Sequence, residues 1–187
     1  MRVRTEGPGL VLLITGPPGS GKTTVADLVA ASFPRSVHVE ADRFFRFIRS
    51  GFIEPWRSES GEQNDAVMSV ISSAAADYAD AGYVTIVEGI LIPDQYLERV
   101  ADALHDRGLD VSVVMLRTDL ATALTRAAGR SDEPLRNPEA IEKIWTEFQG
   151  IDRLSRFEID TQGRTTREAA DSIGDRLAAG DLRWRRA

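Results

Sequence analysis

The amino-acid sequence predicts a three-layer α/β/α fold built on a five-stranded parallel β-sheet, with small lid segments. Two observations carry this prediction. Short apolar runs alternate with segments of helical periodicity along the chain, which is typical of a parallel sheet covered by helices. A glycine-rich turn directly follows the first apolar run, as in a strand–loop–helix unit. With 187 residues, of which 42% are hydrophobic, the chain has enough material for a single domain over residues 1–187.

The strands are expected in five apolar runs: Leu10–Thr15, Ser36–Glu40, Tyr83–Val87, Asp110–Leu116 and Arg156–Asp160. Between these runs, apolar residues recur at the spacing of one helix face. The clearest sets are Val67, Val70, Ile71, Ala74 and Tyr78; Leu97, Val100, Ala101 and Leu104; Leu120, Ala123, Leu124 and Ala127; and Ile141, Ile144, Trp145 and Phe148. A last helix is predicted from about Thr166 to Ala179, with Ala170, Ile173 and Leu177 facing inward and Gly180 as its stop.

The turn after the first predicted strand matches the pattern G-x-x-x-x-G-K-[ST]. Glycines let the main chain curl around a polyphosphate with its N–H groups inward, and the following helix presents its positive end to the same anion. Lys22 adds a point charge for the β- and γ-phosphates, and the Thr23 hydroxyl can hold Mg²⁺. The pattern predicts a P-loop nucleoside triphosphate hydrolase fold that binds ATP with Mg²⁺. Its residues are Gly16, Pro17, Pro18, Gly19, Ser20, Gly21, Lys22, Thr23 and Thr24.

Carboxylates lie at the ends of the next two predicted strands, with Glu40 and Asp42 at the end of the second and Glu88 at the end of the third. In a parallel sheet these strand ends share one edge with the phosphate loop, so the three acids should converge near the γ-phosphate. We assign Asp42 as the base for an attacking hydroxyl and Glu88 as the metal-side or substrate-side carboxylate. The alternative for Asp42 is an N-cap of a helix over residues 43–49. Which of the three acids is the base stays open.

Two segments exceed a typical connection and are predicted to act as an acceptor-side loop (residues 51–61) and a lid (residues 129–138). Arg46, before the first segment, and Trp56 and Arg57, within it, are candidate substrate contacts. Arginines above an acceptor site suit an anionic or polyhydroxylated substrate. The alternative for the stripe formed by Arg46 with Arg43 and Arg49 is a solvated helix face, and Trp56 could simply hold the loop on the body.

Arg126 and Arg130 lie four residues apart, on one face of the helix that precedes the lid, and Arg136 follows. Arg126 and Arg130 could bridge the nucleotide and neutralise charge that spreads during phosphoryl transfer, a role we assign to Arg130. The alternative is that these arginines only favour the negative end of the helix dipole.

These features resemble the P-loop kinase branch that contains shikimate kinase, gluconate kinase, adenylate kinase and chloramphenicol phosphotransferase. The matching parts are GPPGSGKTT over residues 16–24, the acid Asp42 and RAAGR over residues 126–130. The resemblance spans nearly the whole chain. It implies that Asp42 is the acceptor-side base, that Arg126 lies over the adenine and that Arg130 contacts phosphate.

The segment Ile159-Asp160-Thr161 is similar to the one that backs the adenine ring in that branch. By this similarity the turn over residues 161–164, with Thr161 and Arg164, borders the base. Two departures keep a named acceptor from being carried over. Shikimate kinase has D-x-D where this chain has Glu40-Ala41-Asp42, and a glycine cluster where this chain has Glu88-Gly89-Ile90-Leu91.

Composition narrows the function classes. A formal charge of −6 and a pI of about 5.0 argue against a broad nucleic-acid surface. The absence of cysteine excludes disulfides and thiol catalysis. The N-terminus shows neither a signal peptide nor a membrane span, so the expected compartment is the cytoplasm. His38 and His105 are expected to be structural, and the basic tail over residues 183–186 is expected to fray.

The leading hypothesis is therefore an ATP-dependent kinase that phosphorylates a hydroxyl of a small-molecule acceptor. A nucleotide-binding ATPase or regulator without an acceptor is one alternative, and a polynucleotide 5′-kinase is another. A GTP switch is disfavoured because the sequence lacks N-K-x-D, and its D-x-x-G match, Asp171–Gly174, falls in the last predicted helix. The oligomeric state stays open.

Overall fold

The computed structural model describes residues 9–129, 135 and 137–186. Within this part of the chain the strands are β1 (Leu10–Thr15), β2 (Ser36–Glu40), β3 (Val84–Glu88), β4 (Asp110–Arg117) and β5 (Glu158–Asp160). The α-helices are α1 (Lys22–Ala30), α2 (Ala41–Phe45), α3 (Gly61–Asp80), α4 (Leu97–Asp106), α5 (Leu120–Ala128), α6 (Pro138–Thr146) and α7 (Thr166–Ala179). Short 3₁₀ helices cover Ser58–Ser60 and Asp152–Phe157.

The strands form one parallel sheet in the order β2-β3-β1-β4-β5. The predicted α/β class, the parallel sheet and all five strand positions are confirmed. The largest difference is at β5, which begins at Glu158 rather than at Arg156, because the preceding residues form a 3₁₀ helix. In the register of β2 against β3, Glu40 pairs with Glu88, so the topology brings two of the predicted acids side by side.

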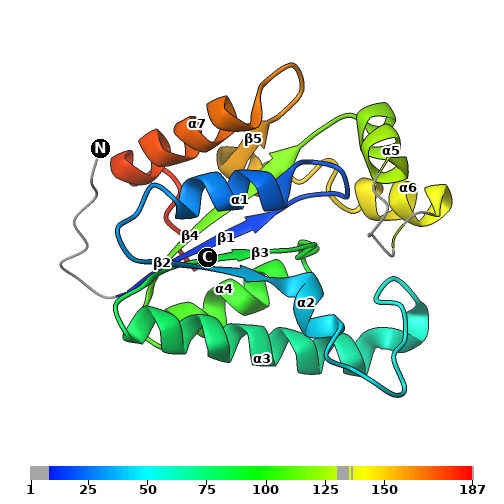
Figure 1. Cartoon of the computed structure of the whole chain (residues 1–187), viewed down its shortest axis with the longest axis horizontal. Coiled ribbons are helices and arrows are strands. Elements are labelled where there is room, and N and C mark those ends of the chain that lie inside the picture. The colour runs from blue at the N-terminus through cyan, green and yellow to red at the C-terminus, as the bar shows by residue number, and fades with distance from the viewer. Residues whose placement is uncertain (1–8, 130–134, 136, 187) are drawn as a thin grey trace.

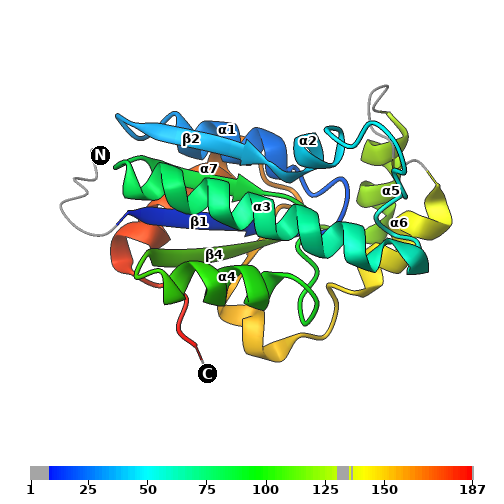
Figure 2. The same cartoon turned by 90° about the horizontal axis from the view of Figure 1, so that it is seen from below.

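Helices cover both faces of the sheet and thereby make the three layers. Figure 1 shows α1 and α7 on one face and α3 and α4 on the other, while α2, α5 and α6 gather beyond the carboxyl ends of the strands. The view in Figure 2 agrees with this arrangement. Because parallel strands end at one edge, every segment that follows a strand opens on the same end of the molecule.

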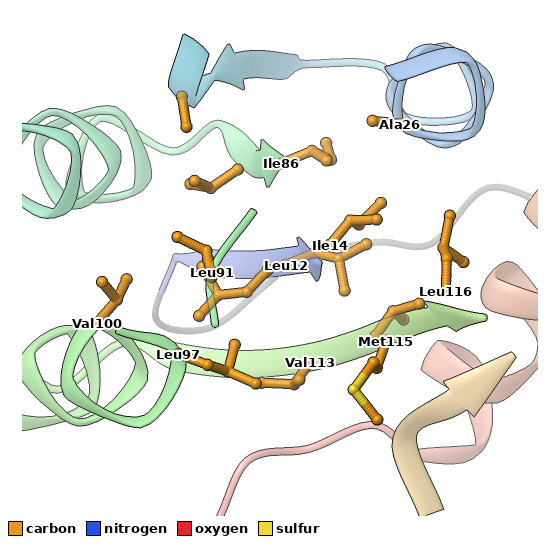
Figure 3. Close-up of a cluster of buried hydrophobic side chains, with 14 of the residues drawn as sticks. Leu12, Ile14, Ala26, Ile86, Leu91, Leu97, Val100, Val113, Met115 and Leu116 are labelled. Carbon is orange, nitrogen blue, oxygen red and sulfur yellow. The ribbon is translucent and has the colours of Figure 1, made fainter. Parts of the chain in front are cut away.

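The core lies on both sides of β1, whose residues from Val11 to Ile14 are fully buried. Figure 3 shows Leu12 and Ile14 among side chains from β3, β4, α1 and α4. Strands buried on both faces read as continuous apolar runs rather than alternating ones. This explains why β1 was recognisable in the sequence.

Two helices differ from the predicted patterns. The helix after β2 covers Ala41–Phe45 rather than residues 43–49, because Phe47 and Ile48 donate backbone N–H groups to Phe44 and Phe45 three residues earlier, which tightens and ends the helix. On α3, Val70 and Tyr78 are exposed, although they were predicted on its inner face. The buried face of α3 instead carries Asn64, Val67, Met68, Ile71, Ala75, Ala76 and Ala79.

The expectation of a frayed basic tail is wrong. The backbone N–H of Trp184 donates to the Val111 carbonyl at 2.7 Å, and Arg183 forms an antiparallel bridge to Ser112. The Trp184 side chain is only 8% exposed, and its indole N–H donates to Asp102 at 2.9 Å. The tail is therefore fixed against β4 and α4.

Among the described residues, none of the helices has the length and apolar character that a membrane crossing requires.

Candidate functional site

The phosphate loop joins β1 to α1 at the carboxyl edge of the sheet. Its shape depends on glycine, because Gly16 and Gly19 have φ angles of 146° and 74°. A Cβ atom at Gly19 would also lie 2.7 Å from the Ala123 carbonyl oxygen, at the start of α5. Lys22 is the first residue of α1, and its Nζ donates to the Pro17 carbonyl at 3.0 Å across the loop. The lysine side chain therefore lies over the phosphate loop, as the sequence pattern predicts.

Glu88, at the end of β3, meets this loop directly. The Thr23 hydroxyl donates to Glu88 Oε1 at 3.1 Å, so the two residues predicted on the metal side are in contact. Glu88 is only 5% exposed. Burial raises the pKa of its carboxyl; the Lys22 ammonium opposes this rise, and the Asp42 charge adds to it.

The residues present fit a bound Mg²⁺. Thr23 and Glu88 offer a hydroxyl and a carboxylate oxygen, which are the donor types that Mg²⁺ prefers. Within the described residues, no three His, Cys, Asp or Glu side chains cluster as metal ligands. In phosphoryl-transfer enzymes, Mg²⁺ is usually held by one or two protein ligands together with substrate phosphates and water. His38 is engaged elsewhere, with Nδ1 2.7 Å from Asp27 Oδ1.

The two acids at the end of β2, Glu40 and Asp42, differ in their surroundings. Asp42 is exposed and lines the cavity described below, whereas Glu40 does not line it. Glu40 instead forms an ion pair with Arg43 at 2.6 Å. Since α2 begins at Ala41, Asp42 lies inside the first turn and does not occupy the N-cap position. The geometry therefore does not support the capping alternative for Asp42.

Two of the predicted nucleotide contacts pack on the phosphate loop. Arg126 of α5 donates from Nη1 to the Gly19 carbonyl at 3.1 Å. The Thr161 hydroxyl is buried and donates to the carbonyls of Ser20 and Arg117, at 3.3 and 2.7 Å. Arg164 is exposed. The turn after β5 is thus pinned to the loop by Thr161, and the nucleotide contacts of these residues remain predictions. Arg130 and Arg136, with most of the lid over residues 129–138, lie outside the described residues.

A cavity of about 530 Å³ joins the phosphate loop to the acceptor-side loop. At one end it is lined by Pro18, Gly19, Gly21, Lys22 and Thr23, and beside them by Asp42 and Glu88. Its size is within the range of roughly 300–1,000 Å³ that is typical of ligand sites. The phosphate loop and the two carboxylates therefore line the same cavity.

The predicted substrate arginines are only partly brought together. Arg46 and Trp56 line this cavity. Arg57 lines a smaller neighbouring hollow of about 280 Å³ and pairs with Glu54 at 3.3 Å. Arg43 is 69% exposed on its side chain and is held by Glu40.

Sequence reasoning missed several residues of the cavity wall. Asn64 and Met68 come from α3, and Ile90, Ile92 and Tyr96 follow β3. Met68 has the spacing of an ordinary apolar residue on a helix face. Ile90, Ile92 and Tyr96 belong to no motif that predicts a ligand site. One feature of the sequence could have identified Asn64. It lies near the start of a helix, on the face that continues into Met68 and Ile71, and a polar residue on such an apolar face predicts a buried polar group.

Comparison with known proteins identifies a family and a shared fold. A family model described as Zeta toxin matches residues 3–161. The structure is similar to that of the Deinococcus radiodurans tunicamycin resistance protein, with 25% identity, a TM-score of 0.67, and coverage of 90% of this chain and 95% of the other. No curated protein matches the sequence significantly.

Two kinases share the fold at 22% identity. Shikimate kinase from Acinetobacter baumannii, solved with shikimate, has a TM-score of 0.65, with coverage of 95% of this chain and 97% of that one. The Mycobacterium tuberculosis APS kinase, solved with AMPPNP and APS, has a TM-score of 0.69, with coverage of 91% and 98%. At this identity the likeness establishes the P-loop kinase fold and not the acceptor.

Proposed function

The chain belongs to the zeta toxin family, and we propose that it is an ATP-dependent phosphotransferase that moves the γ-phosphoryl group of ATP to a hydroxyl of a small-molecule acceptor. One observation carries this proposal. A single cavity is lined at one end by the phosphate loop and continues past Asp42 and Glu88 into the space under the acceptor-side loop. A nucleotide-binding site without an acceptor has no need of that second space.

The loop amides and Lys22 hold the triphosphate and neutralise its charge. Thr23 and Glu88 are the proposed Mg²⁺-side ligands, and Mg²⁺, when bound, neutralises charge on the transferring group. Asp42 is the proposed base, because it lines the cavity beside the loop and can accept the proton of the attacking hydroxyl. Arg126 and Arg130 remain the proposed nucleotide-side cations.

On the acceptor side, Trp56 and Arg46 are the proposed substrate contacts, since both line the cavity. Arg57 is left out of this proposal because it faces the neighbouring hollow. Structures with the same fold have been solved with small molecules. One neighbour was solved with shikimate, and another with both AMPPNP and APS.

The test is acceptor-stimulated release of ADP. Purified protein with ATP and Mg²⁺ is offered neutral alcohols, shikimate, gluconate, APS, a nucleotide-linked sugar and an oligonucleotide with a 5′-hydroxyl. We expect one small-molecule class to raise ADP release at least about tenfold over the basal rate, because transfer to a positioned hydroxyl is faster than transfer to water. The matched control is Lys22→Ala, in which the stimulation should vanish.

The outcomes separate the alternatives. Stimulation only by the oligonucleotide would favour a polynucleotide 5′-kinase. ADP release that no acceptor changes, but that Lys22→Ala abolishes, would favour an ATPase or regulator. Either result would reject the small-molecule kinase.

A further inference from the structure

A glycine stands at each end of the acceptor-side loop (residues 51–61), which lies between α2 and the start of α3 (Figure 1). Gly51 has a φ angle of 74°, a conformation that favours glycine. An added Cβ atom would meet nothing within 4 Å at Gly51 or at Gly61. Two aromatic side chains of the loop, Phe52 and Trp56, line the cavity. The position of this loop therefore sets part of the wall on the acceptor side.

The side-chain amide of Gln63, near the start of α3, holds the first part of the loop. The Ile53 N–H donates to Gln63 Oε1 at 2.9 Å, and Gln63 Nε2 donates to the Ile53 carbonyl at 2.7 Å. A backbone N–H only donates and a carbonyl only accepts, so these two bonds assign both ends of the amide. Paired residues on antiparallel strands exchange two bonds in the same way. Gln63 thus fixes the backbone directly after Phe52.

A second contact holds the middle of the loop. The Pro55 carbonyl, directly before Trp56, accepts hydrogen bonds from Ser60 Oγ and Asn64 Nδ2, both at 2.8 Å. A backbone hydrogen bond of 3.0 Å closes a turn over residues 54–57, and this turn carries Trp56. The loop is therefore attached to the start of α3 on both sides of the residues that face the cavity.

The two contacts differ in burial. Ser60 and Asn64 are 1% and 4% exposed, so removing either would leave buried polar groups without partners, which is costly. Gln63 and Ile53 are only partly buried, and water can take over the backbone groups of Ile53 when the amide is lost. The main effect of the Gln63 contact is therefore on the position of the loop and not on the stability of the fold.

Given the proposed phosphotransferase function, we infer that Gln63 is a positioning residue for the acceptor. Its amide holds the acceptor-side loop against α3 and so places Phe52 and Trp56 in the wall that the acceptor meets. The phosphate loop lines a different part of the cavity. The Gln63 contact therefore acts on binding of the acceptor and not on binding of the nucleotide.

Gln63→Met tests this inference, because it keeps the length of the side chain and removes both hydrogen bonds. The acceptor used is whichever of shikimate, gluconate, APS and the nucleotide-linked sugar gives the largest ADP release with the wild type. We expect its KM to rise about tenfold and kcat to stay within about twofold, since a wall that positions the acceptor is lost and the reacting groups are kept. The AMPPNP affinity, measured by calorimetry, should not change. Glu62→Met, at the exposed neighbouring position, is the matched control and should leave all three values as in the wild type.

Fluorine NMR of protein labelled with 5-fluorotryptophan detects the loop independently of transfer. The chain has three tryptophans, and Trp56→Phe assigns the Trp56 signal. In Gln63→Met this signal should shift or broaden, because the loop is no longer held in one position, while the signals of Trp145 and Trp184 stay in place. If Gln63→Met does not fold, Gln63→Glu serves the same comparisons, because its carboxylate cannot donate to the Ile53 carbonyl at neutral pH.

An unchanged Trp56 signal in Gln63→Met would overturn the inference, and so would a wild-type KM or an equal rise of KM in Glu62→Met. Loss of AMPPNP affinity, or movement of all three tryptophan signals, would overturn it as well, because Gln63 would then support the whole fold. If no acceptor raises ADP release in the wild type, the proposed function fails. The Trp56 signal then still decides whether Gln63 positions the wall.

Discussion

At the scale of single residues, opposing effects act on the pKa of the Glu88 carboxyl group. Burial disfavours its charged form, while the hydroxyl of Thr23 and the ammonium of Lys22 favour it. A carboxylate kept in such a place at the expense of stability is typical of functional sites. The residue that serves the proposed metal side therefore also makes the fold less stable at neutral pH.

Glu88→Gln should raise the free energy of unfolding at pH 7 while impairing phosphoryl transfer. The pKa of Glu88 is raised on folding, so its ionisation destabilises the native state, and this loss appears as the pH rises above 4.5. Urea denaturation of both proteins at pH 4 and pH 7 measures the difference, which should be larger at pH 7. Glu142→Gln, an exposed change on α6, is the control and should show no such pH dependence. A variant less stable than the wild type at pH 7 would contradict this reading of Glu88.

Asp42→Asn should lower the rate of transfer by about 10²–10⁴-fold, the usual contribution of a general base. Because Asp42 lies inside the first turn of α2 and is exposed, nucleotide affinity and thermal stability should stay nearly unchanged. Single-turnover kinetics and calorimetry with AMPPNP measure the two effects separately. If this variant transferred the phosphoryl group at the wild-type rate, another carboxylate would have to be the base.

The phosphate-loop residues could be predicted from the sequence because their chemistry is local. Spacing alone placed Lys22 and Thr23 beside the strand end, and the parallel topology then brought Glu88 to them. Asn64 could not be predicted in the same way. Its partners at Pro55 and Ser60 depend on how the acceptor-side loop folds back on α3, which no short motif encodes.

At the scale of secondary-structure elements, the position of α2 depends on a close approach to the segment after β3. A Cβ atom added at Gly89 would lie 2.6 Å from the Cβ of Ala41, the first residue of α2. Only glycine fits there without moving the helix. Since Asp42 is the next residue, this contact sets where the proposed base lies.

Gly89→Ala should therefore shift the start of α2 and reduce transfer by about tenfold or more, because small misplacement of a reacting group is costly. Nucleotide affinity should fall much less, since the phosphate loop is untouched. Comparing kcat with the AMPPNP affinity tests this. Gly61→Ala, where an added Cβ meets nothing within 4 Å, is the control. Equal effects of the two substitutions on kcat would show that the contact has no functional role.

The short length of α2 shows what periodicity leaves undetermined. Phe44, Phe45 and Ile48 have helical spacing, but bonds to residues three positions back end the helix at Phe45. The periodicity of α3 was also too coarse to predict that Val70 and Tyr78 are exposed. Apolar spacing predicts that a helix exists, and tertiary packing decides its ends and its buried face.

At the scale of the whole molecule, the C-terminal tail closes the core beside β4. Trp184 contacts Phe157 with ring centroids 5.8 Å apart and bonds Asp102 of α4. The sequence did not predict this, because three arginines around one tryptophan read as an exposed end. Their partners, such as Asp110 for Arg183, are acids far away in the chain that only the fold brings near.

Trp184→Ala should lower the free energy of unfolding by about 3–5 kcal/mol, as removal of a large buried aromatic side chain usually does. Chemical denaturation monitored by circular dichroism measures it. The neighbouring Arg185→Ala changes an exposed side chain and should stay within about 0.5 kcal/mol of the wild type. Similar small effects of both changes would mean that the tail does not stabilise the fold.

The central claim is that a single cavity holds the triphosphate of ATP at one end and the hydroxyl group of the acceptor beside it. Phosphorus NMR of the protein with ATP, Mg²⁺ and the acceptor panel tests it most directly, because it identifies where the γ-phosphoryl group goes. We predict a new phosphate-ester signal that grows in step with ADP in the wild type and is absent with Lys22→Ala. Formation of ADP and inorganic phosphate alone, whichever acceptor is present, would contradict the account.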